Sequence, residues 1–192
     1  MNLLTYLEKG LNYPDYLRKI EGQLDDLEKS GDEKGYGKYY SINLKRIERL
    51  DKSFELSDEQ KEKLKSVPTN FRLLTISEGW CGDAAQSMPV INVMMNELGV
   101  DQKIVLRDEN PELMDAYLTD GARSIPIYIG LDDNGEEIFR FGPRPREGMK
   151  MLKKHKENPE VYTDDDFHKD LQVWYNQDKG KAIFEEFLEA IQ

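Results

Sequence analysis

The sequence Trp80-Cys81-Gly82-Asp83-Ala84 contains the only cysteine of the 192-residue chain. It lies between a strand-like run over residues 71–77 and an apolar helical pattern that continues to residue 98. A cysteine at such a junction has its sulfur near the unpaired N–H groups of a helix start, where the local field favours thiolate over thiol. The spacing of residues 81–84 is that of a Cys-X-X-Cys redox motif whose second thiol is replaced by a methyl group. One thiol can attack a disulfide, but it cannot complete a two-thiol cycle alone.

The composition argues against several classes of protein. A net charge of −11 is unfavourable for nucleic-acid binding, which needs a basic surface. No apolar run approaches the roughly 20 residues of a membrane span, so no membrane partner is expected. Residues 1–8 lack both the basic and the apolar region of a signal peptide, and one cysteine forms no internal disulfide. We therefore expect a cytoplasmic protein, whose 38% hydrophobic residues support a packed core.

The first 67 residues predict helices. Apolar side chains recur at helical spacing over residues 17–27 and again over 40–54, and a glycine-rich charged loop over 30–37 separates the two patterns. Residues 57–60, Ser-Asp-Glu-Gln, have the form of a capping box that opens a short helix. We interpret the apolar stripes as surfaces that face the core, with a partner-binding groove as the alternative.

The central part of the chain alternates between strand and helix patterns. Gly99 stands at the expected end of the helix that follows the cysteine, and Pro111 opens a second helix. Asn134-Gly135 between two β-rich runs predicts a hairpin, because both residues accept positive φ. The order is therefore β-α-β-α-β-β, an α/β fold with a mixed sheet, followed by helices from about residue 147. The predicted strands span residues 71–77, 103–107, 127–131 and 137–141.

Two motifs in this part resemble those of thioredoxins. Trp80-Cys81-Gly82 stands where thioredoxins have Trp-Cys-Gly, and Pro89 lies at the spacing of their helix-kinking proline. Residues 121–126, Gly-Ala-Arg-Ser-Ile-Pro, resemble the family's Gly-x-Arg-Gly-Ile-Pro segment, whose proline is cis. The resemblance implies a thioredoxin-like fold, with a mixed β-sheet flanked by helices, an N-terminal helical extension and a helical C-terminal tail. We place the extension at residues 1–67, the thioredoxin-like core at 68–155 and a C-terminal helical segment that packs on the core at 156–192.

The resemblance also implies where the site lies. In thioredoxins the Ile-Pro loop lies against the cysteine, so Ile125 and Pro126 are the expected substrate-binding residues. There the backbone of Ile125 would pair with an extended substrate chain by strand addition while a disulfide meets the catalytic Cys81. A proline that only starts an edge strand is the alternative reading of Pro126. The predicted active-site motif comprises Trp80, Gly82, Asp83 and Ala84 around that cysteine.

The sequence departs from the thioredoxin pattern at three positions. Ala84 replaces the second cysteine, so no intramolecular thiolate can release a trapped substrate. Thr75 stands where thioredoxins have a buried aspartate that serves the missing thiol. Asp83 replaces the usual proline; its carboxylate stabilises a helix start but disfavours a neighbouring thiolate. From these opposing effects we predict a mildly lowered pKa for Cys81.

Two arginines and two histidines elsewhere in the chain are further site candidates. Arg144 and Arg146 follow the last strand; they are positioned to hold an anionic thiol cofactor or an acidic substrate tail, although solubility of the loop is the favoured interpretation. His155 and His168 are the only histidines, and both are expected to be exposed to solvent. One cysteine and two scattered histidines lack the spacing of a zinc site, so no metal is expected.

These features favour a monothiol thiol–disulfide oxidoreductase, in which an external thiol resolves a mixed disulfide on Cys81. Its expected partner is a protein disulfide or thiol. No resident cofactor is expected, although a low-molecular-weight thiol is a candidate for the resolving partner. The main alternative is a redox-inactive thioredoxin-fold module that binds extended peptides or a protein partner. A third possibility is peroxide sensing through a sulfenic acid on Cys81. The oligomeric state is not predicted.

Overall fold

The computed structural model describes residues 1–32 and 35–192; Glu33 and Lys34, in the predicted loop over 30–37, lie outside the described residues. Helices and strands occur where the patterns predicted them, with strand limits within one residue. The helices are α1 (Leu3–Lys9), α2 (Tyr13–Ser30), α3 (Gly37–Ser53), α4 (Asp58–Leu64), α5 (Gly82–Leu98), α6 (Pro111–Ala116), α7 (Arg146–Glu157), α8 (Asp164–Asp178) and α9 (Lys181–Ile191). The strands are β1 (Arg72–Ser77), β2 (Gln102–Leu106), β3 (Ile127–Leu131) and β4 (Glu137–Phe141).

The four strands form one mixed sheet in the order β2-β1-β3-β4, which confirms the predicted α/β class. Strand β1 pairs with β2 in parallel and with β3 antiparallel, so that Thr75 lies opposite Ile104 and Tyr128. Strand β4 continues the sheet antiparallel to β3. On the outer edge of β2, Leu11 exchanges two backbone hydrogen bonds of 2.8 Å with Ile104, which covers part of an otherwise unpaired edge.

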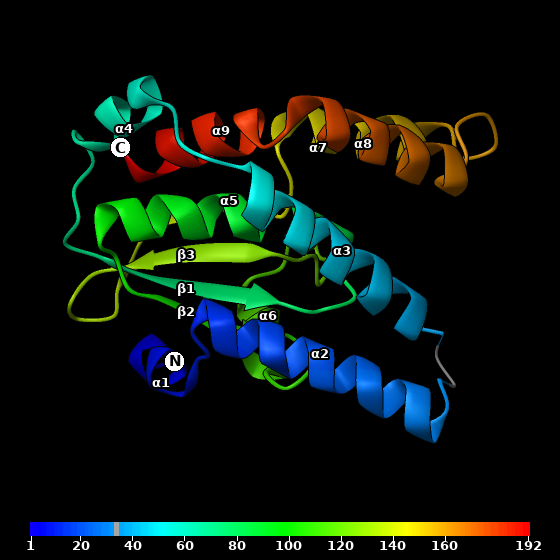
Figure 1. The fold of residues 1–192 in the computed structure, drawn as a ribbon, viewed down its shortest axis with the longest axis horizontal. Coiled ribbons are helices and arrows are strands. Elements are labelled where there is room, and N and C mark those ends of the chain that lie inside the picture. Colours follow the sequence, from blue (N-terminus) through cyan, green and yellow to red (C-terminus); the bar gives the residue numbers. More distant parts are fainter. Residues whose placement is uncertain (33–34) are drawn as a thin grey trace.

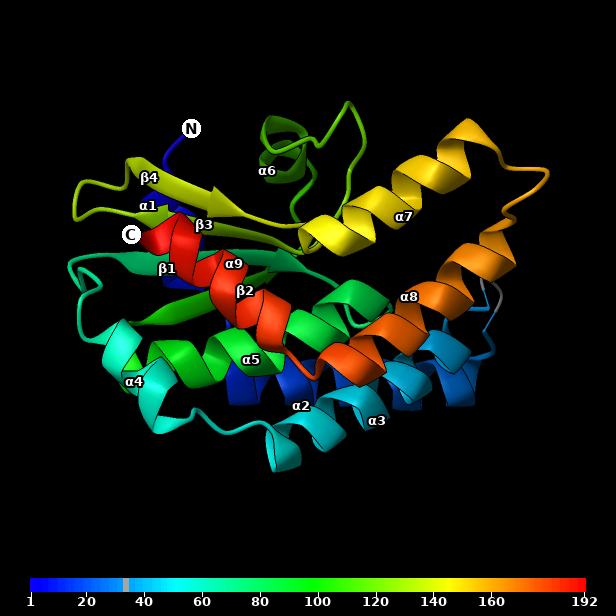
Figure 2. The same cartoon turned by 90° about the horizontal axis from the view of Figure 1, so that it is seen from above.

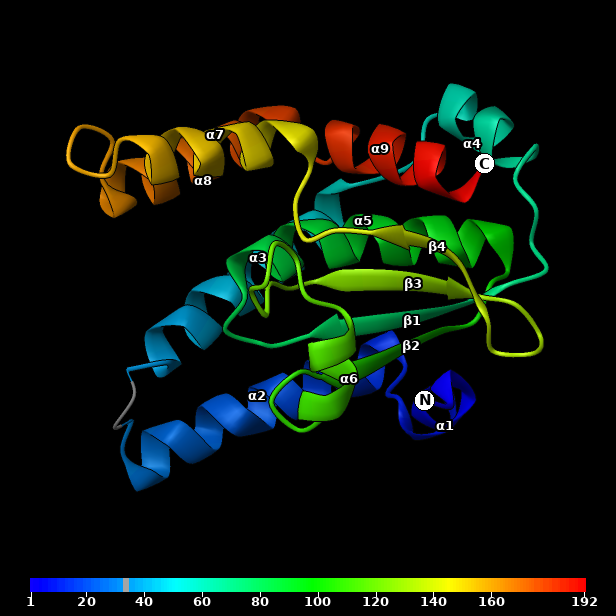
Figure 3. The same cartoon turned by 180° about the vertical axis from the view of Figure 1, so that it is seen from behind.

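Helices cover both sides of the sheet. Figure 1 shows α3, α5 and α9 on one side and α1 and α2 on the other, and the view from behind in Figure 3 places α6 on the second side as well. The helices of the predicted extension and of the C-terminal segment thus pack on the same core as the strands. Figure 2 shows α7 and α8 as a hairpin that reaches past the end of the sheet. The core side chains of α9 include Phe187, whose ring packs edge-on against Tyr128 and Phe141.

Local sequence signals explain several helix ends. The capping box at Ser57 forms as predicted, and Thr163 forms a second capping box at the start of α8. Gly99 ends α5 in the left-handed conformation expected of a glycine C-cap. The hairpin between β3 and β4 differs from the two-residue turn that Asn134-Gly135 suggested: only Gly135 has positive φ, because the Asp132 carboxylate accepts backbone hydrogen bonds and widens the turn.

The site lies where β1 ends and α5 begins. Helix α3 packs along α5 and reaches this end of the sheet, and the α7–α8 hairpin approaches it from the other side (Figures 1 and 2). The turn between β1 and α5 is held close to the helices of the N-terminal region. A Cβ atom added to Gly79 would lie 2.4 Å from the ring of Tyr40 and 2.8 Å from Ile20, so only glycine fits there. The loop that carries the cysteine is therefore fixed by close packing.

Candidate functional site

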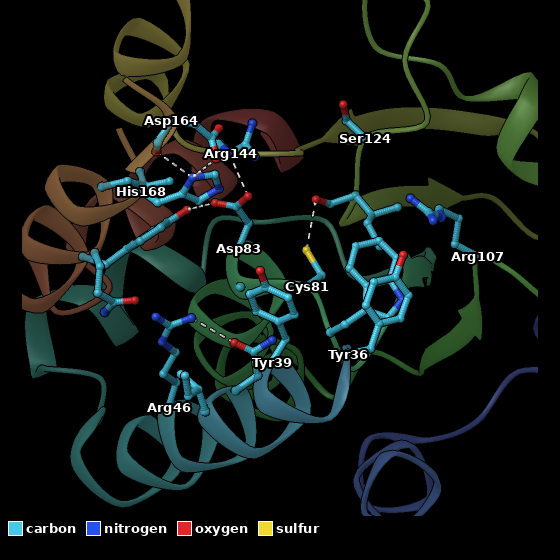
Figure 4. A pocket seen from close by; sticks show the side chains of 18 of the residues that line it. Tyr36, Tyr39, Arg46, Cys81, Asp83, Arg107, Ser124, Arg144, Asp164 and His168 are labelled. Carbon is cyan, nitrogen blue, oxygen red and sulfur yellow. Dashed lines mark hydrogen bonds and ion pairs between the residues drawn. The ribbon is translucent and has the colours of Figure 1, made fainter. Parts of the chain in front are cut away.

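The two thioredoxin-like motifs meet at Cys81. This residue is the N-cap of α5, and its Sγ accepts the backbone N–H of Ala84 at 3.5 Å. The thiol also donates to the backbone carbonyl of Ile125 at 3.3 Å, across 44 residues of sequence. The peptide bond between Ile125 and Pro126 is cis. The cysteine and the Ile-Pro loop therefore lie side by side, as Figure 4 shows for the thiol and its acceptor.

A cavity of about 590 Å³ lies beside this pair. Five of the predicted site residues line it: Trp80, Cys81, Gly82, Asp83 and Ile125. The other two predicted residues, Ala84 and Pro126, are buried and do not line the cavity. One wall comes from α3 and the opposite wall from α8, so elements from both flanking segments build the site. These walls contain Tyr36, Tyr39, Ile42, Asn43 and Arg46 on the α3 side, and Asp164, Asp165, His168, Leu171, Gln172 and Tyr175 on the α8 side.

The prediction of a mildly lowered pKa for Cys81 is wrong. Its side chain is only 6% exposed, and burial raises the pKa of the thiol to about 12. The Asp83 carboxylate raises this pKa further, and the helix-start N–H groups with Arg144 offset only part of the increase. Loss of hydration, which the sequence did not reveal, therefore outweighs the field of the helix start. In the free protein at neutral pH the thiol is protonated.

The Asp83 side chain is held by residues far away in the sequence. Its carboxylate accepts a 2.8 Å hydrogen bond from the hydroxyl of Tyr175 on α8 and forms a 2.7 Å ion pair with Arg144. Burial raises the pKa of Asp83, and both partners oppose that rise. Solubility is thus the wrong interpretation for Arg144, whose side chain is 17% exposed. Arg146 lies on the surface and pairs with glutamates of α9.

Trp80 is held between two neighbours at the rim of the cavity. Its ring centroid lies 5.7 Å from that of Tyr36, and the Arg107 guanidinium lies 4.4 Å from the Trp80 ring centroid. Tyr36 directly precedes α3, and Arg107 directly follows β2. The tryptophan therefore connects the α3 wall to the sheet.

At the position of the family's buried aspartate, Thr75 is fully buried in the middle of β1. Its hydroxyl accepts a 3.1 Å hydrogen bond from the side-chain amide of Gln102. A neutral hydrogen-bonded pair thus occupies the place of an ionisable group. This agrees with the absence of a second thiol that such a group would serve.

The two histidines differ in their surroundings. His168 is exposed at the cavity wall, as predicted. His155 is not exposed: its ring stacks on Phe167 at 5.8 Å, and Nδ1 lies 2.7 Å from the carbonyl oxygen of Tyr162, so the prediction was wrong. Within residues 1–32 and 35–192, no group of three or more His, Cys, Asp or Glu side chains is arranged to hold a metal ion.

Sequence reasoning missed the contributions of α3 and α8 to the site. The available signal was polar residues at inward positions of apolar stripes. Asn43 is 1% exposed, and its amide donates to the carbonyl of Gly79 at 3.0 Å. Arg46 follows one turn later and reaches the cavity. Tyr175, counted among the apolar residues of its helix, uses its hydroxyl to bind Asp83.

Comparison with known proteins gives the family. Residues 32–158, more than half of the chain, match the sequence model of a family described as thioredoxin. The chain belongs to the thioredoxin family. The match of this thioredoxin family member begins before α3 and ends after α7, so it includes the α3 wall and excludes α8. No curated protein matches the chain in sequence.

Two solved structures share the fold of this thioredoxin family member. One is the crystal structure of a Pseudomonas aeruginosa protein of unknown function, with a TM-score of 0.66 and 14% identity over 98% of this chain and 96% of that chain. The other is an HIV epitope scaffold, with a TM-score of 0.57 and 16% identity over 78% of this chain and 81% of that chain. Identities this low show the fold alone.

No helix of the described residues is long and apolar enough to cross a membrane.

Proposed function

We propose that the protein carries out thiol–disulfide exchange of the monothiol type, with Cys81 as the nucleophile. The observation that carries the proposal is the position of its Sγ. The sulfur lies 3.3 Å from the backbone carbonyl oxygen of Ile125, beside a cis X-Pro bond and next to a cavity of about 590 Å³. A disulfide that enters the cavity meets the sulfur and the extended backbone of the Ile-Pro loop together.

The exchange has two balanced steps. Cys81 loses its proton to solvent, and the thiolate attacks one sulfur of the substrate disulfide. A bond forms between Sγ and that sulfur, the substrate S–S bond breaks, and the departing thiolate takes a proton from solvent. An external thiol, of low molecular weight or from a protein, then attacks the substrate sulfur of the mixed disulfide as its thiolate. A disulfide forms between these two sulfurs, the bond to Sγ breaks, and Cys81 takes a proton from solvent. No second cysteine of this chain takes part.

The raised pKa of Cys81 limits this chemistry. With a pKa of about 12, about one thiol in 10⁵ is ionised at pH 7. Exchange therefore depends on the cavity, because a disulfide held against the sulfur reacts at an effective concentration far above that of a free solute. Small reagents that do not bind the cavity should react slowly, whereas a bound disulfide should react faster than the degree of ionisation alone predicts.

The same pKa supports a second candidate function, a redox-inactive module that binds an extended peptide or a protein segment. In that case the thiol serves only as a donor to Ile125 and as packing at the cavity floor. Serine at position 81 keeps a hydrogen-bond donor of similar size. A binding module would therefore retain its ligand after Cys81→Ser, whereas an exchange protein would lose its product.

The test is formation of a mixed disulfide. The reduced protein is incubated at pH 7.5 with 2-hydroxyethyl disulfide, and its intact mass is followed with time. The proposal predicts one adduct per chain, absent from Cys81→Ser and released by added thiol. Failure of the folded wild type to form an adduct with this reagent or with a charged disulfide of similar size would favour the binding module.

A further inference from the structure

The charges around the cavity are unevenly paired. Four arginines line it, and three of them are paired to carboxylates. Arg144 is 2.7 Å from Asp83, Arg107 is 2.8 Å from Asp108, and Arg123 is 2.7 Å from Asp115. The remaining arginine, Arg46, has no carboxylate partner among the described residues.

Arg46 is nevertheless held in one position. Its Nη1 donates to the side-chain oxygen of Asn43 at 2.9 Å, and the amide of Asn43 is itself anchored on the carbonyl of Gly79. Asn43 is a neutral partner, so it fixes the guanidinium without neutralising it. Burial and the nearby Arg49 lower the pKa of Arg46 more than the charge of Asp83 raises it, so on balance the surroundings disfavour the charged guanidinium. An anion in the cavity would relieve this cost.

The guanidinium lies close to the nucleophile. A Cβ atom added to Gly82, the residue after Cys81, would be 3.2 Å from Arg46 Nη1. Glycine at this position therefore leaves room for the guanidinium against the first turn of α5. A group bound to Arg46 therefore lies near the first turn of α5, next to Cys81. When this group belongs to a disulfide substrate, only a few bonds separate it from the substrate sulfur that meets Cys81 Sγ. Figure 4 shows Arg46 projecting from α3 and Cys81 at the start of α5, both among the side chains that line the cavity.

We propose that the substrate is a low-molecular-weight disulfide with a carboxylate a few bonds from its sulfur, and that Arg46 binds this carboxylate. The inference rests on the proposed exchange function and names its substrate class. A guanidinium recognises a carboxylate by paired charge-assisted hydrogen bonds, which sets the orientation of the ligand. The cavity volume of about 590 Å³ suits a small molecule of this kind. Arg46 acts as a specificity residue, and the exchange reaction itself is unchanged.

Three disulfides of similar length test the proposal: 3,3′-dithiodipropionate is anionic, 2-hydroxyethyl disulfide is neutral and cystamine is cationic. For each disulfide, the rate of mixed-disulfide formation with the folded protein is divided by the rate with the unfolded chain. This ratio removes the differences in intrinsic reactivity among the three disulfides. The folded protein has a net charge of −11 and should repel the anion. We expect the opposite order, with the anionic probe favoured about tenfold over the neutral one.

Variants assign this preference to one residue. Arg46→Gln should lower the rate with dithiodipropionate about tenfold and leave the neutral probe unchanged, and Arg46→Lys should retain part of the preference. Lys45→Gln is the matched control, because it removes one positive charge from an exposed position of α3 that does not line the cavity. An unchanged preference in Arg46→Gln, or an equal loss with all three probes, would overturn the inference.

A binding measurement separates this inference from the exchange function. Cys81→Ser cannot form the adduct, so calorimetry with dithiodipropionate reports recognition alone. We expect binding that weakens about tenfold when Arg46→Gln is added to Cys81→Ser. If no probe reacts with the wild type, the exchange function fails, and this binding result decides the carboxylate site by itself. Equal affinity of the two variants, or no binding to either, would reject the site.

Discussion

Replacing Glu78 by glutamine should stabilise the protein above neutral pH. Glu78 lies directly after β1 and is 3% exposed, and one of its carboxylate oxygens accepts the backbone N–H of Asp108 at 2.8 Å. Burial raises its pKa from 4.5 to about 7; the charges of Asp108 and Glu109 add to the rise, and the hydrogen bond from the Asp108 N–H and the charge of Arg107 oppose it. The folded protein therefore favours the neutral acid, and ionisation of Glu78 costs stability.

The sign and size of the effect follow from this pKa. Below pH 4.5 the carboxyl group is protonated in both the folded and the unfolded chain and costs nothing. Between pH 4.5 and 7 only the unfolded chain releases the proton, so the free energy of unfolding decreases as pH rises. Above pH 7 the full penalty applies, about 3 kcal/mol at about 1.4 kcal/mol per pH unit. Glutamine carries no charge and avoids this penalty, which corresponds to a melting temperature roughly 6–12 °C higher at pH 8.

Urea unfolding at pH 4.5, 6 and 8 measures this difference. The wild type and Glu78→Gln should be similar at pH 4.5 and differ by about 3 kcal/mol at pH 8. Glu160→Gln, a change in an exposed turn, is the control and should follow the wild type at every pH. Equal stability of Glu78→Gln and the wild type at pH 8 would refute the reasoning, because it would mean that Glu78 is ionised without cost.

Three further substitutions test the site. Asp83→Asn removes a charge that raises the pKa of Cys81, so alkylation by iodoacetamide at pH 8 should accelerate, and an unchanged rate would argue against the coupling. The same variant leaves Arg144 buried without its ion-pair partner and should lose about 3 kcal/mol in urea unfolding. Gly79→Ala places a Cβ atom 2.4 Å from the Tyr40 ring and should cost about 2 kcal/mol; full stability in thermal unfolding would contradict the packing described. Ala84→Cys restores a second thiol and should confer insulin disulfide reduction, and its failure to do so would favour the binding module.

The strands and helices could be predicted from local signals, and the meeting of the two motifs from the resemblance to thioredoxins. Short apolar runs located the strands, and the capping box at Ser57 located a helix start. The juxtaposition of Cys81 and Ile125 followed from the resemblance to thioredoxins, since spacing alone does not place two segments 44 residues apart against each other. The relative position of these two residues could therefore be predicted from the sequence.

The surroundings of the cysteine could not be predicted from the sequence, because they depend on tertiary packing. Burial of Cys81 reverses the expected direction of its pKa, and no sequence pattern reports the hydration of one sulfur. Arg144 had the appearance of a loop residue until its partner Asp83 was located. Arg46 and Tyr175 come from helices that were interpreted only through their apolar stripes. The common partner of Arg144 and Tyr175, Asp83, lies on another element of the fold, and sequence periodicity does not reveal such pairs.

The central claim is that Cys81 is unreactive toward general reagents and reactive toward a disulfide held in the cavity. It is tested most directly by comparing the folded protein with the unfolded chain toward two reagents, iodoacetamide and 3,3′-dithiodipropionate, at pH 7.5. Because burial raises the thiol pKa, the folded protein should react more slowly than the unfolded chain with iodoacetamide. Because the cavity positions the disulfide, the folded protein should react faster than the unfolded chain with dithiodipropionate. Slower reaction of the folded protein with both reagents would contradict the account and leave Cys81 as a buried packing residue.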